Sequence, residues 1–102
     1  MADFTGAYLH HLAVAGCVLN DVYREAANLE MKIDGVRVRA CGGFDSVTWA
    51  STGIEYDVDI ASDAADSDIE YLIRVVDDAA EIPKTLRSAT KVVRRSNPSK
   101  FE

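Results

Sequence analysis

Cys17 is the residue of this chain whose type and setting are best suited to chemistry. It interrupts the run HHLAVAGCVLN at residues 10–20, which otherwise has the spacing of a helix. On a helical wheel Cys17 shares a face with His10, Asp21 and Arg24, whereas the main apolar stripe falls on the opposite side. Cysteines that only fill space are usually buried among apolar neighbours. This polar setting therefore supports a working thiol about as well as inert packing.

Arg24 is the candidate group for activating that thiol. Helical side chains lean toward the N-terminus, so Arg24, two turns after Cys17, points back at the sulfur and could stabilise its thiolate. Asp21, one turn after Cys17, competes, because its carboxylate either binds the arginine itself or disfavours negative charge on the sulfur. The sequence leaves both outcomes open.

The remaining metal-ligating and nucleophilic residues give weaker signals. Cys41 is expected on the outer face of a strand, where a cysteine needs no explanation beyond tolerance. His10 and His11 point in different directions from a helix and have no further ligands at regular spacing. We therefore predict neither a metal site nor a cofactor.

The elements that must position these residues begin with a long helix over residues 5–30. Its apolar residues recur at helical spacing and predict one buried stripe. The stripe consists of Leu12, Ala15, Leu19, Val22, Ala26 and Leu29.

Two strands follow, around residues 36–41 and 54–60, each with alternating apolar and polar side chains. Pairing them antiparallel about Thr48 places opposite charges together on the exposed face and apolar residues on the buried one. The expected partners are Arg37 with Asp59, Arg39 with Asp57, and Cys41 with Glu55.

The C-terminal half is predicted to add two helices and a strand. Ser67 and Glu70 have capping-box spacing ahead of an apolar helical stripe, which predicts a helix over residues 67–81. Pro83 suits the first turn of a short helix that ends near Ala89.

The last segment, TKVVRR at residues 90–95, is predicted to be a strand, and residues 96–102 are expected to be a frayed tail. The resulting class is α+β, a long central helix against a small antiparallel sheet. Because so small a sheet has open edges and leaves much of the helix uncovered, we expect a homodimer.

Composition limits the function classes. With 102 residues and 48% hydrophobic content, we predict one domain, residues 1–102. The net charge of −6 argues against nucleic-acid binding, which needs a basic surface. We expect the basic groups near the C-terminus to pair with the acidic body. They are Lys84, Arg87, Lys91, Arg94, Arg95 and Lys100.

The N-terminal apolar stretch has no basic flank and contains His10 and His11, so we expect neither a signal peptide nor a membrane span. Two cysteines without an export signal indicate a reducing compartment. The expected location is the cytoplasm.

Three stretches in order, HLAVAGCVLNDVYREA, VDIASD and VVDDAAEIPKTLRSATKV, resemble the family of osmotically inducible protein C (OsmC) and organic hydroperoxide resistance protein (Ohr). The resemblance covers residues 5–94 and puts Cys17 on the family's reactive cysteine. It implies an intertwined homodimer with two central helices packed together and active sites built from both chains. It also implies reduction of organic hydroperoxides, with the cysteine oxidised to a sulfenic acid.

The sequence departs from the family at the residues that assist this cysteine. Ile82-Pro83 stands where the family has a Cys-Pro pair, and the orienting glutamate would fall near Ala7. The family's arginine comes from a strand-rich N-terminal segment that we do not find in this sequence. Arg24 is the candidate substitute for the cation and Cys41 for the resolving thiol; otherwise an external thiol must reduce the sulfenic acid.

Three hypotheses follow from the sequence. The first is a one-cysteine thiol peroxidase with Cys17 as nucleophile, active in the oxidative stress response. The second is a non-catalytic dimer of the same fold that binds a small apolar ligand or a protein partner. The third takes the acidic body and basic end as a charge-matched assembly surface.

Overall fold

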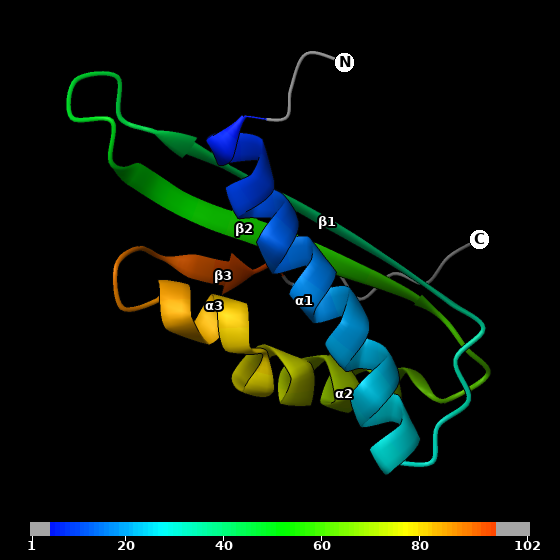
Figure 1. Ribbon diagram of the computed structural model, residues 1–102. Helices are drawn as coiled ribbons and strands as arrows, with labels where there is room; N and C mark the ends of the chain where they lie inside the picture. The colour runs from blue at the N-terminus through cyan, green and yellow to red at the C-terminus, as the bar shows by residue number, and fades with distance from the viewer. Residues whose placement is uncertain (1–4, 96–102) are drawn as a thin grey trace.

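Residues 5–95 are described by the computed structural model, and their order of elements is the predicted one (Figure 1). The elements are α1 (Gly6–Asn28), β1 (Gly35–Phe44), β2 (Ser51–Ala61), α2 (Asp66–Ala79), α3 (Glu81–Leu86) and β3 (Val92–Arg94). The α+β class is therefore confirmed. The predicted tail at residues 96–102 lies outside the described residues.

The sheet has three strands in the order β1-β2-β3. The hairpin of β1 and β2 has the predicted register, with Arg37 opposite Asp59, Arg39 opposite Asp57 and Cys41 opposite Glu55. β3 runs parallel to β2, so the prediction of an antiparallel sheet is wrong for this pair. The chain passes through α2 and α3 before β3, and a helical crossover of this kind returns a strand in the same direction.

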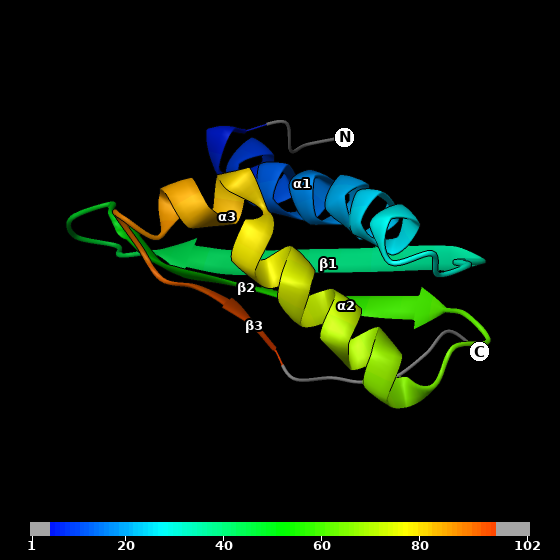
Figure 2. The same cartoon turned by 90° about the horizontal axis from the view of Figure 1, so that it is seen from below.

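Helix α1 lies across one face of the sheet, as a separate layer in Figure 2. It begins after Thr5, whose side chain accepts a hydrogen bond from the backbone N–H of Tyr8 at 3.2 Å. Residues 5–95 contain no helix long and apolar enough to cross a membrane.

The buried face of α1 overlaps the predicted stripe only in part, because Val22 and Ala26 are buried as predicted but the rest of the face is shifted. Val14 and Val18 are fully buried, whereas Leu12 and Leu19 are 46% and 38% exposed. Apolar residues cover more than half of the circumference of this helix, so the wheel alone does not determine which part faces the sheet. The compact valines pack against the strands, and the larger side chains remain outside.

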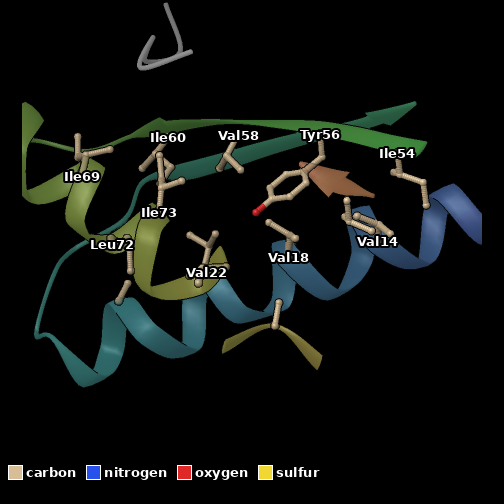
Figure 3. Packing of buried hydrophobic residues seen from close by; sticks show 14 residues of the cluster. Val14, Val18, Val22, Ile54, Tyr56, Val58, Ile60, Ile69, Leu72 and Ile73 are labelled. Atoms are coloured by element: carbon tan, nitrogen blue, oxygen red, sulfur yellow. The ribbon is translucent and has the colours of Figure 1, made fainter. Parts of the chain in front are cut away.

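The core fills the space between the sheet and the helices α1 and α2 (Figure 3). Tyr56 extends from β2 into this layer and is fully buried. The other buried apolar residues are Val14, Val18, Val22, Ala26, Ile54, Val58, Ile60, Ile69, Leu72, Ile73, Val76, Ala80 and Val92. The apolar stripe predicted for the second helix is confirmed at four positions, Ile69, Leu72, Ile73 and Val76.

The start of α2 does not use the predicted capping box. The helix begins at Asp66 after Ala65, and no side chain caps it. Glu70, the expected capping partner, forms a salt bridge with Arg94 of β3 instead. The carboxylate thus links α2 to the sheet rather than to its own first turn.

Of the six basic residues near the C-terminus, Arg87, Arg94 and Arg95 pair with acidic residues, as predicted, and Lys100 lies outside the described residues. Arg87 donates to the Asp77 carboxylate at 2.8 Å and to the backbone oxygen of Val92 at 2.9 Å. The Tyr56 hydroxyl donates to the same carboxylate. Burial, and then the bond to Asp77, raises the pKa of Tyr56 well above its ordinary value. This network joins α2, α3 and β3 to the buried face of β2.

Candidate thiol site

Cys17 lies in the middle of α1, partly buried and packed against the core. Val14 and Val18, its neighbours on the wheel, are both fully buried. The prediction that Cys17 lies opposite the buried face is therefore wrong. The reason is the rotation of α1 described above, which turns the edge of the predicted polar face inward.

Asp21 is the nearest polar neighbour of the thiol. Its side chain is 2% exposed, and its Oδ2 atom is 4.0 Å from the sulfur of Cys17, one helical turn earlier. Asn20 donates to the other carboxylate oxygen at 3.2 Å. A carboxylate this deep needs hydrogen bonds or a cation to remain charged.

Arg24 supplies that cation. Its Nη2 atom is 3.1 Å from Asp21 Oδ2, and its Nε atom is 3.3 Å from Glu25. Of the two outcomes left open by the sequence, the structure has the one in which the carboxylate binds the arginine. Asp21, and after it Glu25 and Glu81, raises the pKa of Arg24, so the guanidinium is held by carboxylates.

Glu81 completes the cluster and was missed by the sequence analysis. It is the first residue of α3, and its carboxylate is 3.9 Å from Arg24 Nη1. The sulfur of Cys17 and one carboxylate oxygen each of Asp21 and Glu81 all lie within 4.8 Å of one another. A signal existed, because Glu81 directly precedes Ile82-Pro83, the pair already singled out in the sequence as a departure from the family that it resembles.

Cys41 is on the other side of the sheet. It is exposed on β1 opposite Glu55, on the face that carries Arg37 and Arg39, while α1 covers the opposite face. The structure therefore does not bring the two cysteines together within one chain, and it gives no support to Cys41 as an intramolecular resolving thiol.

Two hollows in the surface lie away from the carboxylate cluster. The larger, of about 640 Å³, is between the end of α1 and the start of α2, with Met31 and Tyr71 in its lining. The other, of about 360 Å³, is between α1 and the edge of β1 and is lined by His11, Leu12 and Val38 among others. Neither hollow is lined by Cys17, so the thiol lies apart from both.

The sequence matches no protein-family model and no curated protein sequence. Solved structures do match. An OsmC-like protein from Mycoplasma pneumoniae superposes with a TM-score of 0.83 at 17% identity, over 93% of this chain and 72% of that one.

Two further structures carry names of the same group. An organic hydroperoxide resistance protein OsmC from Legionella pneumophila has a TM-score of 0.78 at 11% identity, over 92% of this chain and 70% of that one. The organic hydroperoxide resistance protein OhrB of Bacillus subtilis has a TM-score of 0.72 at 14% identity, over 93% and 71%. Residues 5–95 thus have the fold of the OsmC and organic hydroperoxide resistance proteins.

Proposed function

We propose that this protein reduces organic hydroperoxides through Cys17, with an external thiol as reductant. The observation that carries the proposal is the setting of Cys17: a partly buried thiol on the central helix of an OsmC/Ohr fold, beside the junction of α2 and α3. In the resemblance drawn from the sequence, that junction is where the family keeps its second cysteine.

The reaction assigns a definite role to the sulfur. The Cys17 thiolate attacks the terminal oxygen of the hydroperoxide and the O–O bond breaks, which makes the sulfur a sulfenic acid. The alkoxide leaves as the alcohol after it takes up the proton that the thiol released. One external thiol then forms a mixed disulfide and releases water, and a second frees Cys17. A reducing compartment such as the cytoplasm would supply those thiols.

Arg24 enters this proposal as a positioning residue. Its side chain is 44% exposed and binds the Asp21 carboxylate, which lies 4.0 Å from the sulfur of Cys17. Within this reaction its positive charge offsets the negative charge of the Asp21 carboxylate beside the sulfur, since a positioned cation favours the charged form of a nearby thiol.

We also propose a homodimer that uses the outer face of α1. Five large apolar side chains of this helix are each at least 38% exposed, more than isolated surface residues require. They are Tyr8, Leu9, Leu12, Leu19 and Tyr23. Light scattering after gel filtration tests this directly, and a monomer at all concentrations would contradict it.

The test of the peroxidase function is intact-mass spectrometry of the reduced protein after one equivalent of an organic hydroperoxide. We expect a gain of one oxygen, or the adduct of an added thiol, in the native chain and in Cys41→Ser but not in Cys17→Ser. An unmodified native protein would contradict the proposal.

A second candidate function is binding of a small apolar ligand without catalysis. The hollow of about 360 Å³ between α1 and β1 favours it, because it lies within the size range of ligand pockets and combines apolar side chains with a few polar ones, among them His11 and Arg39. A protein that leaves hydroperoxide unchanged but is stabilised against heat by an apolar ligand would support this function.

A further inference from the structure

The spacing of Cys17, Asp21 and Glu81 is that of a metal site. Cys17 and Asp21 are four residues apart on α1, the separation at which two helical side chains ligate one ion. Glu81 approaches from the start of α3, and the three donor atoms lie within 4.8 Å of one another. A tetrahedral zinc ion holds sulfur and oxygen ligands about 3.6 Å apart, so a closure of about 1 Å is enough.

The local charge also favours a cation. Three carboxylates, Asp21, Glu25 and Glu81, form their salt bridges with the single guanidinium of Arg24, the one cationic partner that they have among residues 5–95. One positive charge therefore faces three negative ones. Asp21 is the deepest of the three, so the uncompensated charge is partly shielded from water.

The cluster is accessible from solvent on one side. The side chains of Glu81 and Arg24 are 71% and 44% exposed, whereas that of Asp21 is 2% exposed. Glu81 is thus free to turn toward the sulfur, and Arg24 is free to turn outward. An ion can therefore approach the cluster from the side of Glu81.

We propose that Cys17, Asp21 and Glu81 bind a divalent cation that prefers thiolate together with carboxylate, and that this ion is zinc. Soft sulfur and hard oxygen ligands together suit zinc rather than magnesium or calcium, which take oxygen alone. Three protein ligands leave the fourth position to water. The thiol releases its proton to solvent on binding, and the ion takes the place of the Arg24 guanidinium at Asp21.

No metal site was predicted from the sequence, because the adjacent His10 and His11 have no further ligands at regular spacing. Zinc binding does not depend on the proposed function. Its consequence for the reaction does rest on that function: a sulfur that donates electron density to zinc is a weaker nucleophile than the free thiolate, so the ion makes Cys17 less reactive toward hydroperoxide.

The experiment is a titration of the reduced protein with cobalt(II), which replaces zinc and absorbs in the near ultraviolet only when a thiolate binds it. We expect one equivalent of cobalt to produce this band and one equivalent of zinc to abolish it. Cys17→Ser should lose the band, and Glu81→Gln should weaken cobalt binding about tenfold or more.

The matched controls lie on the other face of the sheet, where Cys41 is opposite Glu55. Cys41→Ser and Glu55→Gln should keep both the band and the affinity of the native chain. A band that survives Cys17→Ser, or one that Cys41→Ser removes, would overturn the proposal, as would the absence of any band at micromolar cobalt.

Two additional measurements separate this site from the proposed reaction. Arg24→Ala removes the competing cation and should tighten cobalt binding severalfold. Weaker binding would contradict the proposed displacement of the Arg24 guanidinium from Asp21 by the ion. Hydroperoxide oxidation of Cys17 is then followed with and without zinc. A protein that binds zinc through Cys17 but never reacts with hydroperoxide would contradict the proposed function and leave the metal site standing.

Discussion

Asp21 on α1 and Asp57 on β2 are both buried carboxylates that bind arginine, but the charges around them are balanced in opposite ways. On the outer face of the sheet, Asp57 and Asp59 share three guanidinium groups. They belong to Arg37, Arg39 and Arg95. On the face of the sheet that α1 covers, the single guanidinium of Arg24 pairs with three carboxylates, which we call the inner cluster. They belong to Asp21, Glu25 and Glu81.

This difference separates a structural cluster from a reactive one. Each aspartate of the outer face has a full complement of charged donors, fixed by the register of the hairpin. The inner cluster keeps an excess of negative charge beside a thiol. The excess negative charge of this cluster can bind a proton, a substrate or an ion. We therefore place the function at the inner cluster, beside Cys17.

The largest effect is expected from Asp57→Asn on the outer face. The change removes the carboxylate that Arg39 and Arg95 share, and losing two hydrogen bonds between charged groups at a buried aspartate costs about 3 kcal/mol of unfolding free energy. Urea denaturation measures it. The control is Glu55→Gln, two residues earlier and exposed, which should stay within about 0.5 kcal/mol of the native chain. Equal values for the two variants would contradict a structural role for the outer cluster.

The outer cluster was predictable from the sequence and the inner one only in part. Strand side chains alternate with a period of two, so a single turn position determines every cross-strand partner, and the pairs Arg37–Asp59 and Arg39–Asp57 followed directly. A helix with apolar residues around most of its surface has no such constraint. The face of α1 was therefore predicted correctly only at Val22 and Ala26, and the burial of Cys17 was predicted wrongly.

Glu81 shows a second limit of sequence reasoning. It is far from Cys17 along the chain and reaches it only because α3 turns back against α1 after α2. No periodic pattern reports such a contact. The parallel direction of β3 has a similar origin, since it depends on where two helices lead the chain rather than on the residues of the strand.

A glycine stands beside each thiol, and the two should respond to alanine in opposite directions. A Cβ atom at Gly42, next to Cys41, would lie 2.4 Å from the backbone oxygen of Gly53, so Gly42→Ala should cost about 2 kcal/mol. At Gly16, next to Cys17, nothing lies within 4 Å, and Gly16→Ala should stabilise the helix by about 1 kcal/mol. Thermal denaturation of both variants and the native chain measures these changes in stability. A loss at Gly16 would indicate that this face of α1 is closely covered.

Asp21→Asn tests the inner cluster in the way that Asp57→Asn tests the outer one. Arg24 keeps Glu25 and Glu81 as partners, and the amide can still accept a hydrogen bond, so we expect a loss of only about 1 kcal/mol. The same urea denaturation applies. If Asp21→Asn cost as much as Asp57→Asn, the inner cluster would also be structural, and the contrast between the two regions would fail.

The smallest effect concerns His11, where α1 meets the hairpin away from both clusters. Its Nε2 atom is buried without a hydrogen-bond partner, and the ring stacks on Phe44. Burial, and then the neighbouring His10, lowers the pKa of His11 below 6.5. The unfolded chain therefore binds a proton at a pH where the folded chain does not, and the free energy of unfolding should decrease as the pH falls through about 6.5. Urea midpoints measured from neutral to acidic pH should show this decrease in the native chain and a shallower one in His11→Gln. Identical slopes in the two proteins would show that the imidazole titrates alike in both states and that its burial carries no charge penalty.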